Sequence, residues 1–218
     1  MLKNPIHCPA FLLYLLLMLC PATQNLANDE IDHSLNEMDS AKTQFFDATE
    51  SKKHAPLDFR ITYPESWRFI DLNIPGEIGR LISDANPEMA WVRMKKKMLP
   101  DKKKQAPSEV FDSGFFLEYD RSASEPSQPK QKLIKAEQVT LGSRQGAIVE
   151  FYRSTDMPGT DLKIRQHVAT FFFIQNGHLV EIQYNTSLSL PEDQATDNMW
   201  IKSSARLWES ILKTLVVR

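Results

Sequence analysis

Cysteine is nearly absent from this chain of 218 residues, and glycine is scarce. The two cysteines, Cys8 and Cys20, both lie within the first 22 residues. If these residues are removed by cleavage, the remaining chain has no disulfide, no thiol nucleophile and no thiolate metal ligand. An exported protein of this size without disulfides fits a bacterial periplasm better than a eukaryotic extracellular space, where disulfides are common.

The shortage of glycine also excludes known phosphate-binding loops. The seven glycines are scattered singly at expected turns, so neither a G-x-G-x-x-G motif nor a P-loop can form. H-E-x-x-H, G-x-S-x-G and EF-hand patterns are missing as well. Basic and acidic residues nearly balance, 26 against 28, whereas general nucleic-acid binders are usually strongly basic. We therefore predict no cofactor, no metal and no nucleic-acid partner.

Only one hydrophobic run is long, and it lies near the N-terminus. Ala10–Leu19 has ten apolar residues, a length typical of a signal-peptide core and too short to span a bilayer. We predict that residues 1–22 are a cleavable signal peptide, with cleavage after Ala22 or Ala27. The alternative, a lipoprotein acylated at Cys20, is less favoured because a leucine precedes that cysteine, where a small residue is preferred. We predict no transmembrane segment in the mature chain.

Residues 23–56 are polar with a few scattered apolar side chains, and we predict a flexible N-terminal arm. A weak amphipathic helix between Ile31 and Phe46 is the alternative. Pro56 then precedes a single domain that comprises residues 57–218.

A β-hairpin within Asp161–Asn185 is the strongest local signal in the chain. β-Branched and aromatic runs flank Asn176-Gly177, a pair that favours a type I′ turn with φ > 0 at both positions. In the resulting register one face is wholly apolar, with Phe173 opposite Val180, Phe171 opposite Ile182 and Ala169 opposite Tyr184. The other face is mixed, with Thr170, Phe172 and Ile174 opposite Gln183, Glu181 and Leu179. Such a hairpin requires cover on both faces.

Alternation and helical periodicity predict the remaining elements. Strands are expected at residues 57–63, 67–71, 79–83, 89–98, 132–140 and 147–152, and lysines at the end of 89–98 are typical of an edge strand. Helices are expected at residues 108–121, capped by Ser108, and at residues 200–215, with Trp208 central in the apolar stripe. The prediction is an α+β domain in which a mostly antiparallel sheet of about six to seven strands is sandwiched between helices.

A cluster of lysines is the one unusual surface feature, and it is a candidate interaction patch. It comprises Lys95, Lys96, Lys97, Lys102, Lys103 and Lys104. Such a patch can meet an anionic lipid headgroup or an acidic partner, mainly by steering their encounter. The simpler interpretation, which the sequence favours, is a solvated strand end and loop tip protected from aggregation.

No catalytic residues are predicted. His167 and His178 lie roughly 25–30 Å apart in the predicted hairpin at ~3.3 Å per residue, too far to share a metal. Carboxylates such as Asp84 and Asp156 are spread along loops, and nothing in their spacing brings two of them to one cleft.

The segment FRITYPESW, Phe59 to Trp67, resembles the opening strand and turn of the PsbP/DcrB-like superfamily. The order that follows is also similar: a hairpin, a helix, the strand around Gly146, a long hairpin ending in Asn176-Gly177-His178 and a closing helix. The resemblance covers about residues 56–217. It implies an antiparallel sheet between helices and protein binding rather than catalysis, with no catalytic motif to carry onto this chain.

Two hypotheses for function follow. The first is an exported, non-catalytic binding or accessory protein of the periplasm that contacts another protein, such as a membrane-associated one, at a membrane complex. The second is a periplasmic hydrolase, in which Asp or Glu side chains converge with His167 or His178 in a cleft.

Overall fold

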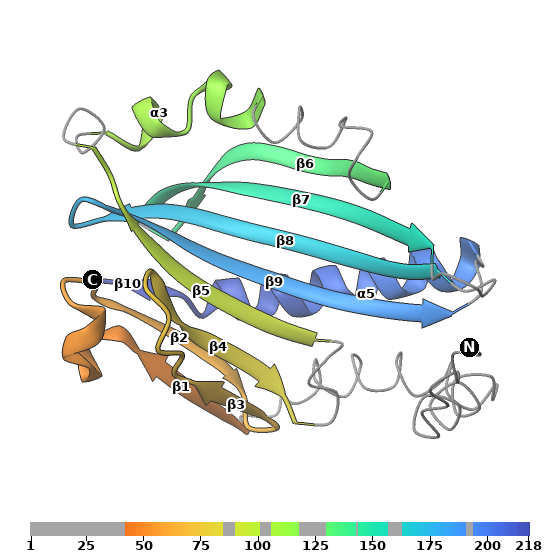
Figure 1. The fold of residues 1–218 in the computed structure, drawn as a ribbon, viewed down its shortest axis with the longest axis horizontal. Coiled ribbons are helices and arrows are strands. Elements are labelled where there is room, and N and C mark those ends of the chain that lie inside the picture. The colour runs from red at the N-terminus through yellow and green to blue at the C-terminus, as the bar shows by residue number, and fades with distance from the viewer. Residues whose placement is uncertain are drawn as a thin grey trace, which may run out of the picture.

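The computed structural model describes residues 42–84, 90–100, 106–117, 130–142, 144–156, 163–190 and 194–218, and within them seven antiparallel strands form the central sheet (Figure 1). In spatial order they are β3 (Trp67–Ile70), β4 (Glu77–Ser83), β5 (Ala90–Met98), β9 (His178–Leu190), β8 (Lys163–Gln175), β7 (Arg144–Asp156) and β6 (Lys130–Leu141). A second sheet joins β1 (Thr43–Asp47), β2 (Phe59–Pro64) and β10 (Val216–Val217). The predicted fold class is confirmed.

The central hairpin is formed by β8 and β9 in the predicted register. Phe171 pairs with Ile182, and Phe173 with Val180. Asn176 and Gly177 have φ values of 50° and 75°, the conformation that an Asn-Gly turn favours. The apolar side of this hairpin belongs to what we call the inner face of the sheet, and the mixed side belongs to the outer face.

Helix α5 (Gln194–Lys213) and the small sheet cover the inner face (Figure 1). Trp208 is 1% exposed and its ring stacks on Tyr184 with 5.8 Å between centroids, which confirms its predicted place in the core. Phe59 of the small sheet meets the edge of Phe173 at 5.7 Å. No helix among the described residues is long and apolar enough to cross a bilayer.

The outer face is covered over β7 and β8 by helix α3 (Pro107–Val110) and helical residues 113–117. Phe115 packs edge-on against Phe172 at 5.2 Å. The predicted continuous helix is therefore interrupted. Asp112 accepts a hydrogen bond from the Phe115 N–H at 2.9 Å, so this side chain caps a second helical stretch. Ser108 caps nothing, because α3 begins one residue earlier, at Pro107.

Two other predictions differ from the structure. Strand β5 is not an edge strand, because it pairs with β4 on one side and β9 on the other. Its pairing with β4 ends at Lys95, so of its lysines only Lys96 and Lys97 extend beyond the paired part of β4. Residues 43–56, predicted as part of the arm, form β1 and the short 3₁₀ helices η1 (Ala48–Glu50) and η2 (Lys52–His54), and Phe46 is buried in the main core. The predicted signal peptide lies outside the described residues.

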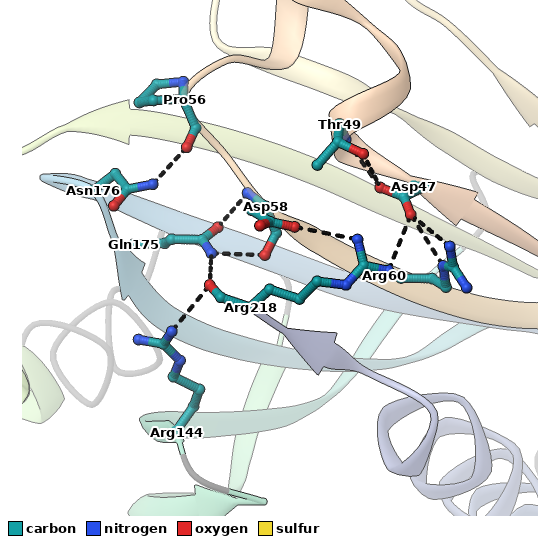
Figure 2. Close-up of polar contacts among 9 residues, drawn as sticks. All are labelled: Asp47, Thr49, Pro56, Asp58, Arg60, Arg144, Gln175, Asn176 and Arg218. Carbon is teal, nitrogen blue, oxygen red and sulfur yellow. Dashed lines mark hydrogen bonds and ion pairs between the residues drawn. The ribbon is translucent and has the colours of Figure 1, made fainter.

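A polar network ties the small sheet to the end of the large one (Figure 2). Arg218 donates to Asp47 and Asp58, and its backbone oxygen accepts from Gln175 at 3.0 Å and Arg144 at 3.1 Å. The Gln175 side chain also bonds both backbone groups of Asp58. Because these residues are far apart in sequence, the network joins the beginning and the end of the described chain.

Candidate functional site

An open cleft of about 410 Å³ lies on the outer face of the sheet, over β4, β5 and β9. Side chains here remain partly accessible: those of Arg80, Arg93 and Lys95 are 37, 28 and 32% exposed. The cleft is lined by the loop before β4 and by charged residues of the three strands: Ile74, Pro75, Gly76, Glu77, Arg93, Lys95, Lys96, Lys97, Leu179 and Glu181. It is therefore a cationic hollow with apolar rims.

A β-bulge places Glu77 in this cleft. The β4–β5 register shifts between Glu77, opposite Lys95, and Gly79, opposite Met94. The shift turns Glu77 to the outer face and leaves Ile78, 0% exposed, in the core. Gly79 is required here because an added Cβ would collide with the Phe69 ring and would lie 2.8 Å from the Ile70 carbonyl oxygen. The bulge thus builds the site without loss of the core.

Glu77 holds the guanidinium groups in place. Its side chain is only 3% exposed and forms an ion pair with Arg93, while Arg80 lies 3.8 Å away. Arg80 also lies over the ring of Trp91, 5.8 Å from its centroid. Glu77 fixes the positions of both arginines, because a buried carboxylate without a cationic partner costs free energy.

The structure divides the predicted lysine patch. Lys95 and Lys97 point to the outer face and line the cleft, with Lys95 3.8 Å from Glu181. Lys96 also belongs to the lining of the cleft, but its side chain alternates to the other side of β5, where its ammonium donates to the backbone oxygens of Lys53 at 2.9 Å and Ala55 at 3.1 Å. Burial and the nearby Lys53 lower the pKa of Lys96. Lys96 is therefore a structural residue, and residues 102–104 lie outside the described residues.

A second group of polar side chains meets beneath α5. His167 Nδ1 lies 2.6 Å from Ser204 Oγ, and His167 Nε2 lies 3.6 Å from Glu150 Oε2. If Ser204 donates to Nδ1, Nε2 carries the proton and faces Glu150, but 3.6 Å is too long for a hydrogen bond, and Nε2 has no hydrogen-bond partner among the described residues. The hydrolase hypothesis expected a carboxylate near His167, and Glu150 is one. The contact with Ser204 was not predicted, because Ser204 comes from the closing helix. His167 and Ser204 are each 0% exposed, whereas the Glu150 side chain is 16% exposed, so only the carboxylate of this group reaches solvent.

The other predicted site residues stay apart. His178 Nδ1 bonds the Asn176 carbonyl at the turn, as expected of a strand histidine. Asp84 is exposed and pairs with Arg68 at 3.1 Å. Within the described part of the chain, no three His, Cys, Asp or Glu side chains lie close enough to hold a metal ion.

Comparisons with known proteins support the fold alone. No protein-family model and no curated protein sequence matches this chain. Among solved structures, PsbP (CyanoP) of the cyanobacterium Synechocystis has 15% sequence identity and a TM-score of 0.52, over 82% of this chain and 94% of that one. The likeness confirms, at the level of the fold, the resemblance seen in the sequence.

Two further structures are similar at lower scores. LpqN of Mycobacterium tuberculosis, described as involved in cell envelope biogenesis, is 14% identical with a TM-score of 0.47, over 83% of this chain and 94% of its own. The Ran-binding protein Mog1p of Saccharomyces cerevisiae is 11% identical with a TM-score of 0.47, over 80% and 95% of the two chains.

Proposed function

We propose that this protein is an exported, non-catalytic binding or accessory protein of the periplasm, which acts through protein–protein contact at a membrane complex. The observation that carries the proposal is the cationic cleft on the outer face of the sheet, over β4, β5 and β9. It offers positioned charges and apolar rims to a partner, and its charged groups are arranged as ion pairs rather than as an acid, a base and a nucleophile. The N-terminal sequence pattern supports export.

Site-specific photocrosslinking in the cells that make the protein tests this function. A photoreactive residue at Leu179, on the rim of the cleft, should give a discrete adduct with one partner protein. The double variant Lys95→Glu/Lys97→Glu should lose the adduct. The matched control Lys202→Glu/Lys213→Glu makes the same charge change on exposed positions of α5 and should keep it. Absence of any adduct from the unmodified cleft would refute the proposal.

The group of His167, Ser204 and Glu150 favours a second candidate, a hydrolase with a serine nucleophile. This candidate ranks lower, because a substrate cannot reach a hydroxyl with no exposed surface unless α5 moves away. Hydrolysis of p-nitrophenyl acetate separates the two. We expect the unmodified protein and Ser204→Ala to show the same background rate, whereas a rate lost in Ser204→Ala would establish the hydrolase.

A further inference from the structure

We propose that the cleft binds an extended acidic segment of a protein, with carboxylates at alternate positions of its sequence. This inference rests on the proposed function and names the chemistry of the partner. It starts from the order of charges along β5, where Arg93, Lys95 and Lys97 follow one another on the outer face.

The spacing of these cations matches an extended peptide. Side chains at positions i and i+2 of a strand lie on one face, roughly 6.6 Å apart at ~3.3 Å per residue. An extended peptide that runs along β5 repeats its own side chains at the same interval. Aspartate or glutamate at every second position can therefore meet Lys95 and Lys97 together, whereas neighbouring acidic residues point to opposite sides.

The charges still available in the cleft are those of the two lysines. Glu77 pairs with Arg93 and approaches Arg80, so it compensates much of the guanidinium charge. Lys95 is only loosely held, 3.8 Å from Glu181. Lys97 is exposed and forms no ion pair with any residue that the structure describes. The two arginines and two lysines face only two carboxylates, those of Glu77 and Glu181. A surplus of positive charge therefore remains at the lysines.

The walls of the cleft are already fixed by hydrogen bonds. The Glu77 N–H donates to the Ile74 carbonyl at 3.0 Å, and the Lys96 N–H donates to the Gly76 carbonyl at 2.7 Å. These bonds position Ile74, 46% exposed, which lines the cleft together with Leu179. A wall formed in advance lowers the entropy lost on binding, and its apolar rims can contact the uncharged residues between the acids.

The shape favours a peptide over an anionic membrane. The lysines line a hollow together with Glu77 and Glu181, which a flat lipid surface cannot enter. A membrane is contacted by protruding cations, whereas a single extended chain can enter a groove. Anionic vesicles therefore serve as the competing probe.

Binding of short labelled peptides to the full-length chain tests the inference. The first peptide alternates acid and neutral residues (Asp-Thr-Asp-Thr-Asp-Thr). The second, which we call the block peptide, has the same composition but no two acids that lie two residues apart (Asp-Asp-Thr-Thr-Asp-Thr). Fluorescence anisotropy at about 20 mM salt preserves surface electrostatics. We expect the alternating peptide to bind about tenfold more tightly than the block peptide, and Lys95→Glu/Lys97→Glu to weaken it by about tenfold or more. The control Lys202→Glu/Lys213→Glu should change affinity by less than about twofold.

The possible outcomes separate this inference from the proposed function. Equal affinity for the two peptides would overturn the spacing argument, as would binding to vesicles of phosphatidylglycerol and phosphatidylcholine without binding to either peptide. A retained crosslink at Leu179 would then still support a partner protein of another chemistry. If the protein selects the alternating peptide but gives no crosslink at Leu179 in cells, the proposed function is refuted and the binding specificity of the cleft is supported.

Discussion

Substitution of Asp47 should destabilise the domain, because this residue is the centre of the network in Figure 2. The residue is 4% exposed. Its carboxylate accepts hydrogen bonds from the Thr49 N–H at 3.0 Å and hydroxyl at 2.6 Å, from Arg60 at 3.0 and 2.9 Å, and from Arg218 at 3.2 Å. Removing it breaks the side-chain contacts that join β1, β2 and the residue that follows β10, although the strands stay paired through their backbones.

The magnitude follows from these bonds and from the exposure of the arginines. A hydrogen bond to a charged group contributes about 1.5–3 kcal/mol, and a neutral one about 0.5–1.5. The side chains of Arg60 and Arg218 are 39 and 41% exposed, so water solvates them again once Asp47 is gone. We therefore expect Asp47→Ala to lower the free energy of unfolding by about 2–4 kcal/mol, and the melting temperature by roughly 5–15 °C. Asp58→Asn is the control, because its exposed ion pair with Arg218 contributes only about 0–1 kcal/mol.

Acid should remove the same stabilisation. The hydrogen bonds of Thr49, followed by those of Arg60 and the charge of Arg218, hold the pKa of Asp47 well below its usual value of 3.8. The native protein therefore binds fewer protons at this site than the unfolded chain, so stability is present above pH 3.8 and is lost as the pH falls below it. Denaturation followed by circular dichroism should show the curves of the unmodified protein and Asp47→Ala converging in acid. A difference independent of pH, or smaller than that of Asp58→Asn, would refute the reasoning.

Three further predictions concern stability. Trp208→Ala should lower the free energy of unfolding by about 3–5 kcal/mol in urea titrations, because it leaves a large cavity beneath α5; an unchanged midpoint would show that the helix does not dock as described. Gly79→Ala should cost about 1–3 kcal/mol because its methyl group collides with Phe69, and Gly79→Ala combined with Phe69→Ala should recover part of the loss. Burial lowers the pKa of His54 from 6.5, so stability should decrease as the pH falls below 6.5, and His54→Gln should flatten that dependence in thermal melts.

The sequence predicted the elements whose signals are local. The Asn176-Gly177 turn sets the register of β8 and β9, since a one-residue slip would expose Phe171 and Phe173. The pairing of β1 and of β10 with β2 could not be predicted, because β1 and β10 come from opposite ends of the described chain. A short strand whose hydrophobic contacts are distant in the sequence resembles a linker when it is considered by itself.

The candidate site was predicted in part. The alternation of side chains along a strand already placed Lys96 on the opposite face from Lys95 and Lys97. The predicted patch nevertheless included all three, because it was defined by closeness in the sequence. Glu77 had no visible signal beyond the glycine two residues later, because a bulge depends on the neighbouring strand as well as on its own residues. The contact between His167 and Ser204 needed the docking of α5, which no spacing along the chain reveals.

The two faces of β5 separate binding from stability. On the inner face Met94 is 0% exposed in the core and Lys96 bonds the backbone around η2, so changes there should destabilise the domain. On the outer face Lys95 and Lys97 make few contacts, so reversing their charge should leave the fold intact. If Lys95→Glu/Lys97→Glu lowers the melting temperature as much as Lys96→Ala does, the two lysines contribute to the stability of the fold and the cleft is not a separate binding surface. If the cleft is an interaction surface, this variant should lose binding and keep the melting temperature of the unmodified protein.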